Sequence, residues 1–187
     1  SGRVVTFSNG ETSSAKLVGF TIQNGSAQRG GGINCNNTSP TISNCQFLNN
    51  AASQNGGKGG GISNSGSSPT VTDCIFIGNS AGDGGGISNI SESSPTLMNC
   101  TFYNNSGFGD GIFNNNGSNP IVTNCIFWGT NDQIENSGAT PIITYSNVQQ
   151  SSGIYSGTGN INADPLFVDA ANGDYSLLDY SPAIGAG

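Results

Sequence analysis

The chain has 187 residues, including 30 Gly, 4 Lys and Arg, 11 Asp and Glu and no His, and its formal net charge is −7. Because it has so few cations and no basic cluster, it is unsuited to binding nucleic acid or anionic lipid, where Lys and Arg must replace counterions. No apolar run approaches the roughly 20 residues of a membrane span, so membrane insertion is not expected. Low charge and abundant Gly can indicate disorder, but the apolar residues recur at fixed positions, which favours an ordered repeat.

Six similar units are predicted along residues 4–148. The first, VVTFSNGETSSAKLVGFTIQNG (4–25), has Phe20 at a position that the next four units give to Cys, and the last unit has Ser146 there. The central units read SPTISNCQFLNN (39–50), SPTVTDCIFIGN (68–79), SPTLMNCTFYNN (94–105) and NPIVTNCIFWGT (119–130). Their cysteines are Cys45, Cys74, Cys100 and Cys125, spaced 29, 26 and 25 residues apart. A repeat of this length predicts a solenoid.

A Gly-rich block lies between successive units and helps to define the fold. It reads GGGI up to Ile33, Ile62 and Ile87, and continues with less Gly at Ile112 and Ile134. From this Ile to the next apolar position is 9 or 10 residues, and from there to the Cys position is 3. Nearly all length variation therefore falls between the Phe segment and the next block. This predicts three short strands, two constrained turns and one insertion-tolerant loop per unit, which is the coil of an all-β, right-handed parallel β-helix with six to seven coils.

Two other repeat architectures fit less well. A leucine-rich repeat needs several Leu in every unit, whereas this chain has six in total. Helical repeats are disfavoured by the Gly and β-branched residues. We therefore expect β-helix coils over residues 1–161 and an irregular capping segment over 162–187, where Pro165, Pro182 and several acidic residues would block further strand pairing.

Stacking of the coils in register would place equivalent side chains in columns. An aromatic stack is expected from Phe47, Phe76, Phe102 and Phe127. The Cys column would serve as small hydrophobes, and free buried thiols are favoured over disulfides, although stacked positions fall within disulfide reach. A left-handed backbone is expected at the bend residues Asn44, Asp73, Asn99 and Asn124. Amide bonds along the axis are expected between Asn64, Asn89, Asn114 and Asn136.

The Gly block and the segments FLNN, FIGN and FYNN resemble the GGA[I/L/V] and FxxN repeats of the polymorphic outer-membrane proteins, bacterial surface adhesins with β-helical passenger domains. The third residue of the block is Gly here instead of Ala, and the WGT after Phe127 loses the last FxxN. Nearly the whole chain also resembles bacterial β-helix repeat proteins of the pectin-lyase-like superfamily. That superfamily includes lyases, hydrolases and adhesins, so the resemblance implies a fold more than a function.

Enzymes of that superfamily imply acidic Ca²⁺ ligands with a basic residue, or carboxylate pairs, on the Gly-block face. Lys58 and Asp83 should stack as an ion pair, which most simply is an exposed pair of little energy. Asp110 and Asp132 should lie on adjacent coils, where with Glu135 they could share Ca²⁺ or act as a retaining-hydrolase pair; the alternative is two solvated carboxylates. No nucleophile, base or oxyanion donor can be assigned, so no catalytic residue, metal or cofactor is predicted.

The residues beside the inward Phe side chains point outward and form an apolar strip. We predict binding residues there at Ile75, Ile77, Tyr103, Ile126 and Trp128. Such a strip is too apolar for a solvated sheet face. Three explanations are open: cover by the variable loop, a protein partner, or a glycan stacked on Tyr103 and Trp128, with cover or protein contact favoured. The Gly-block face, in contrast, should be nearly bare of side chains.

These observations favour a non-catalytic structural or adhesive module of a bacterial protein that is secreted or lies on the cell surface. Its expected partner is another protein or a second copy of itself. The strand in GRVVTF (2–7) has no polar cap ahead of it, so we expect either upstream coils in a longer parent chain or a subunit docked head to tail, which would generate a fibre. The alternative function is a carbohydrate-active or carbohydrate-binding module for an extended polysaccharide.

Overall fold

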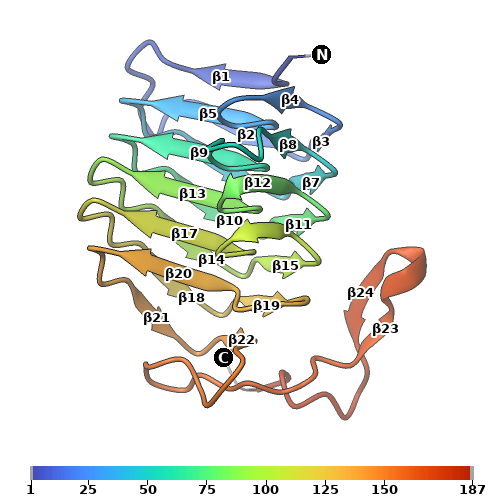
Figure 1. Cartoon of the computed structure of the whole chain (residues 1–187). Helices are drawn as coiled ribbons and strands as arrows, with labels where there is room; N and C mark the ends of the chain where they lie inside the picture. The colour runs from blue at the N-terminus through green and yellow to red at the C-terminus, as the bar shows by residue number, and fades with distance from the viewer. Residues whose placement is uncertain (1, 186–187) are drawn as a thin grey trace.

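The structure is a computed structural model that describes residues 2–185, and it confirms a parallel β-helix of six coils (Figure 1). Every coil contributes one strand to each of three six-stranded parallel sheets, called here sheets A, B and C. The first four coils also contribute to a four-stranded sheet, sheet D. Residues 2–185 contain no α-helix, and hence no helical segment with the length and apolar character needed to cross a membrane.

The strands are short and recur in the same order along the chain. Sheet A contains β1 (Val5–Phe7), β5 (Ile33–Asn36), β9 (Ile62–Ser65), β13 (Ile87–Ile90), β17 (Ile112–Asn115) and β20 (Ile134–Ser137). Sheet B contains β2 (Lys16–Val18), β6 (Thr41–Ser43), β10 (Thr70–Thr72), β14 (Thr96–Met98), β18 (Ile121–Thr123) and β21 (Ile142–Thr144). Sheet C contains β3 (Thr21–Gln23), β7 (Gln46–Leu48), β11 (Ile75–Ile77), β15 (Thr101–Tyr103), β19 (Ile126–Trp128) and β22 (Asn147–Val148). Sheet D contains β4 (Ser26–Ala27), β8 (Ala51–Ala52), β12 (Ser80–Asp83) and β16 (Ser106–Phe108). An antiparallel hairpin follows, with β23 (Phe167–Asp169), the 3₁₀ turn η1 (Ala170–Asn172) and β24 (Asp174–Leu177).

Sheet D corrects the prediction of three strands per unit. Its strands lie in the segment expected to be a loop, and they are built from Ser, Ala and Gly, which give no apolar alternation to detect. They form because the main chain continues to bond from coil to coil: the amide of Ser80 donates to the carbonyl of Asn50 at 2.9 Å, and the amide of Ser106 donates to that of Asn79 at 2.9 Å. Small side chains let the chain approach sheet A closely at this corner.

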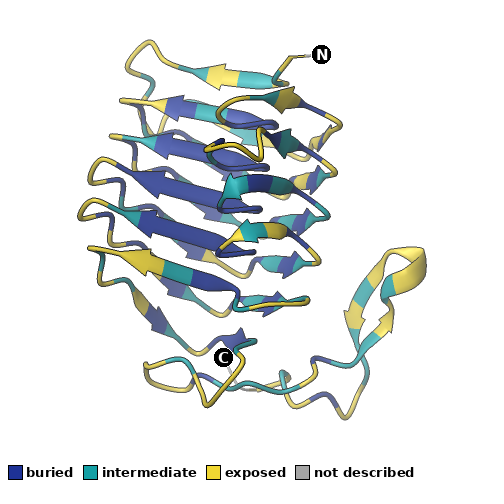
Figure 2. Ribbon diagram, viewed as in Figure 1, coloured by how far each residue is buried: buried dark blue, intermediate teal, exposed yellow. Residues whose placement is uncertain are grey.

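The interior columns confirm the predicted register. The four Phe rings are completely buried and stack with centroids 4.4, 4.5 and 4.5 Å apart. All five cysteines are buried and free, as predicted. Burial is continuous along the inside of the coils, whereas the turns and the C-terminal hairpin are exposed (Figure 2). The core is thus a single column of stacked apolar layers.

The predicted bend residues also take the expected backbone conformation. Asn44, Asp73, Asn99 and Asn124 have φ values of 52°, 54°, 54° and 54°. Asn and Asp tolerate this left-handed region better than other residues with a Cβ atom. Every one of these residues lies between a strand of sheet B and a strand of sheet C, so the side chain at that corner is chosen by the turn.

Two ladders of buried amides run parallel to the axis. The predicted one joins Asn64 to Asn89, Asn114 and Asn136 through Nδ2–Oδ1 bonds of 2.8, 2.9 and 2.9 Å. The other consists of Asn50, Asn79 and Asn105, with bonds of 3.0 and 2.9 Å, and its members also satisfy main-chain groups. These are the Asn residues of the FxxN segments, for which the sequence analysis assigned no structural role.

The first coil departs from the prediction at Phe20. This residue matches the buried Cys position, but its side chain is 58% exposed because β2 and β3 are terminal strands of sheets B and C. Ile22 in the same coil is only 2% exposed, so the apolar rim expected there is narrower than predicted.

Residues 149–163 lie beneath the last coil. Tyr155 packs against the core, and Asn160 accepts from the amide of Ser146 at 3.0 Å and donates to the carbonyl of Ile143 at 2.9 Å. The hairpin formed by β23 and β24 stands beside the coils (Figure 1). The division of the chain at residues 161 and 162 stays a prediction.

The third Gly of each block is required by the Phe stack. A Cβ added at Gly86 would lie 2.7 Å from the ring of Phe102 and 2.5 Å from the carbonyl oxygen of Gly111. We expect Gly86→Ala to lower the free energy of unfolding by about 1–3 kcal/mol through overpacking, measured by urea denaturation. Gly2→Ala is the control, because nothing lies within 4 Å of a Cβ there. Equal stability of the two variants would contradict the assigned packing.

Candidate functional site

The predicted binding strip lies on the outer face of sheet C. Ile75, Ile77, Tyr103, Ile126 and Trp128 are all half-buried there. The C-terminal hairpin covers part of the strip, because the Tyr103 ring lies 5.5 Å from that of Phe167 and 5.4 Å from that of Tyr175. Cover therefore comes from the hairpin and not from the variable loop of the coils. The role of the five residues in binding a partner stays a prediction.

The Gly-block face is not the bare groove that the sequence suggested. Ser63 and Ser88 point outward from sheet A, yet both are 0% exposed, and Phe113 in the same column is 4% exposed. The tight Gly turn folds residues 58, 83 and 108 back over this face. Lys58 Nζ lies 5.4 Å from the centre of the Phe113 ring, and the Phe108 ring lies 5.6 Å from it on centroids. Sequence reasoning missed this cover because it counted only side chains in the strand itself.

The predicted ion pair is present. Lys58 and Asp83 lie in register on neighbouring coils, and Lys58 Nζ contacts the Asp83 carboxylate. Their side chains are 21% and 22% exposed. The pair is therefore partly desolvated and packed against sheet A, more enclosed than the exposed pair that the sequence suggested.

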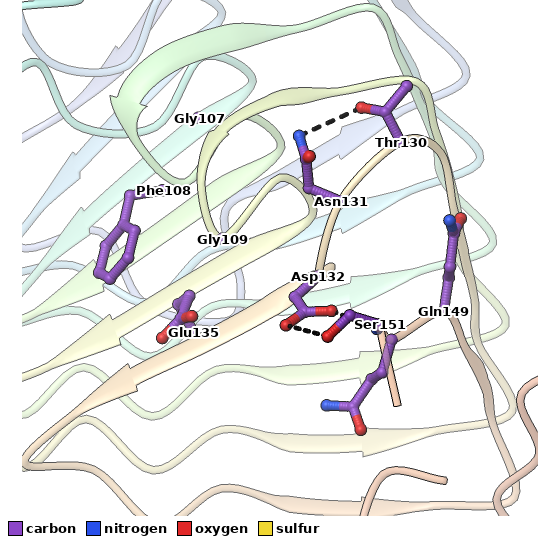
Figure 3. Close-up of a pocket in the computed structure, with 10 residues that line it drawn as sticks. Gly107, Phe108, Gly109, Thr130, Asn131, Asp132, Glu135, Gln149 and Ser151 are labelled. Carbon is purple, nitrogen blue, oxygen red and sulfur yellow. Dashed lines mark hydrogen bonds between the residues drawn. The ribbon is translucent and has the colours of Figure 1, made fainter. Parts of the chain in front are cut away.

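Asp110 and Asp132 lie in register on neighbouring coils, but their carboxylates have separate partners. Asp110 is 1% exposed and accepts from the amide of Gly107 at 2.9 Å and from the side-chain amide of Asn131 at 3.1 Å. Asp132 instead accepts from the amide and hydroxyl of Ser151, at 2.5 and 3.2 Å (Figure 3). Asp110 thus ties a turn to the next coil, and Asp132 ties the last coil to the chain that follows it.

An open pocket of about 450 Å³ lies beside these carboxylates, between sheet A and residues 149–151 (Figure 3). Its wall contains the turn Gly107–Gly109, the segment Thr130–Asp132, Glu135 and the segment Gln149–Ser151. Phe108 is 54% exposed. The sequence analysis named Asp132 and Glu135 here but missed Phe108, Gln149 and Ser151, since residues 149–151 follow the last strand of the repeat and carry no repeat signal.

Titration in this region follows burial. Burial raises the pKa of Tyr155 above its usual value, the hydrogen bond from Asn136 opposes the shift, and the negative charge of Glu135 adds to it. Burial likewise raises the pKa of the Cys35 thiol to about 12. A buried thiol of this kind stays protonated at neutral pH and is a poor nucleophile. Within residues 2–185, no group of three or more His, Cys, Asp or Glu side chains is placed to hold a metal ion.

Comparison with known proteins agrees with the geometry described above. Residues 2–164 match the family described as "Right handed beta helix region". Searches of curated proteins and of solved structures return no significant match. The match covers all six coils and most of the segment beneath the last one. The chain therefore belongs to the right-handed β-helix family.

Proposed function

We propose that this chain is a non-catalytic structural or adhesive module of a bacterial protein that is secreted or lies on the cell surface. The observation that supports this most is the use made of its buried polar side chains. The two Asn ladders and the Asp110 carboxylate bond to the chain's own main-chain and side-chain groups, with hydrogen bonds of 2.8–3.1 Å. These groups stiffen the rod, which suits a module that holds a surface in place.

The proposed partners are proteins. They would bind through the strip around Ile77 and Trp128 where the hairpin leaves it open, or through the ends of the β-helix. A second copy joined end to end would continue the sheets and, because such a contact does not close, generate a fibre. Sedimentation at several protein concentrations measures this association directly.

A second candidate is carbohydrate binding, which the pocket favours. It combines the exposed ring of Phe108 with the amide side chain of Gln149 and the carboxylates of Asp132 and Glu135. An aromatic ring with surrounding hydrogen-bonding groups is a common arrangement at sites for polar ligands.

One assay separates the two candidates. We expect no turnover when the protein is incubated with a panel of acidic and neutral polysaccharides, with new reducing ends and unsaturated products as readouts. Attachment of the same protein to cell-surface or matrix material, in the absence of turnover, is the expected positive result. Turnover that disappears in Asp132→Asn or Glu135→Gln, with the fold retained by circular dichroism, would overturn the proposal in favour of an enzyme.

A further inference from the structure

The fold holds one of its own cations between a carboxylate and an aromatic ring. Lys58 Nζ contacts Asp83 on the next coil and lies 5.4 Å from the centre of the Phe113 ring. An ammonium group is attracted both to a carboxylate and to the face of an aromatic ring, and more strongly where water is partly excluded. The outer face of sheet A therefore contains one complete arrangement for holding a cation.

The pocket repeats the aromatic and acidic parts of this arrangement further along the same columns. Phe108 follows Asp83 in one column, and Glu135 follows Phe113 in the other. The two sites are close, because a Cβ added at Gly109 would lie 3.1 Å from the Cβ of Glu135. Within residues 2–185 the Glu135 carboxylate has no ion-pair partner, and the only ion pair there is that of Lys58. The pocket thus has the ring and the carboxylate but no cation of its own.

The charge distribution leaves this end of the molecule without an internal candidate. All four Lys and Arg residues lie within the first 58 residues, whereas eight of the eleven Asp and Glu residues follow residue 84. A surface of one sign attracts groups of the opposite sign and raises their rate of encounter. The second carboxylate of the pocket, Asp132, adds to the negative potential although Ser151 already binds it.

We infer that this pocket binds a Lys or Arg side chain of a partner protein, with the cationic head between Glu135 and the ring of Phe108. The aliphatic stem of such a side chain can pack on the exposed ring while its head reaches the carboxylate. The pocket of about 450 Å³ is open to one side and admits a long side chain from a surface loop. This assigns a class of partner to the adhesive module and so rests on the proposed function.

The test uses calorimetry of the whole chain with a capped trilysine peptide at low ionic strength. The same peptide with acetylated side chains keeps the length and removes the charge. We expect Glu135→Gln to raise the Kd of the charged peptide roughly fivefold, and Phe108→Ala to raise it about two- to fivefold. Glu92→Gln is the matched control, because it removes an equal charge from an exposed turn, and its effect should stay below about twofold.

Each outcome decides the inference. Selective weakening by the two pocket variants supports it. Equal weakening by Glu92→Gln and Glu135→Gln would show diffuse attraction, and equal affinity of the acetylated peptide would show that charge is not read; either result overturns it. Absence of binding at millimolar peptide also overturns it, as does displacement of the peptide by a neutral oligosaccharide bound at the pocket. The proposed function fails separately, by polysaccharide turnover.

Discussion

Phe76→Ala is expected to lower the free energy of unfolding by about 3–5 kcal/mol, the usual cost of removing a fully buried aromatic ring. Phe76 is 0% exposed, and its ring stacks between those of Phe47 at 4.4 Å and Phe102 at 4.5 Å. The cavity would lie in the middle of a continuous column. The walls cannot easily collapse into it, because strands on both sides are held in register.

The control for this variant is Gln46→Ala. Gln46 lies directly beside Phe47 in β7 but points outward and is exposed. Its loss should change stability by less than about 0.5 kcal/mol. Urea denaturation followed by circular dichroism measures both variants. Similar losses would show that the inward and outward faces of sheet C are wrongly assigned.

Asn79→Ala should be comparably destabilising, by about 3–5 kcal/mol, although it removes a polar side chain. Asn79 is 0% exposed; its Nδ2 donates to the carbonyl of Phe47 at 2.9 Å and to Asn105 Oδ1 at 2.9 Å. Its Oδ1 accepts from both the amide and the Nδ2 of Asn50, each at 3.0 Å. The Ala variant leaves several of these buried groups without a partner, and each costs roughly 1–3 kcal/mol.

Two further variants make this prediction specific to the ladder. Asn55→Ala changes an exposed loop residue of the same type and should have little effect. Asn79→Asp keeps the size but cannot donate, and it places a carboxylate against the carbonyl of Phe47 and Asn105 Oδ1. We expect it to destabilise the protein more than Asn79→Ala does. Equal stability of Asn79→Asp and the parent chain in thermal unfolding would contradict the assigned hydrogen bonds.

The architecture could be predicted because its determinants are local and repeated. The constant distance from each Gly-block Ile to the next apolar residue sets the register, and Asn44 and Asp73 mark the same corner in successive coils. A one-residue error would move the Phe side chains to the outer face. The repetition therefore allows each column to be checked against several coils, which explains why the Phe stack and the amide ladder of Asn64 were correct.

The candidate site was less predictable because it is built where the repeat ends or is interrupted. Sheet D was missed since Ala51 and Ser80 carry no apolar signal, although their main chain pairs regularly. The pocket depends on Gln149 and Ser151, which belong to no repeat unit, and on the way the Gly turn directs Phe108. The cover on Tyr103 comes from residues more than 60 positions later in the chain. No local pattern reports such a contact.

The in-register ladders also bear on how the chain reaches its native state. Bonds between neighbouring coils join residues a short distance apart, such as the 25 residues between Asn64 and Asn89. Closing loops of this length costs little entropy, and each new coil gains a complete set of partners from the one before it. A chain emerging from the ribosome, or from a narrow export channel, can therefore become ordered one layer at a time without waiting for its C-terminus.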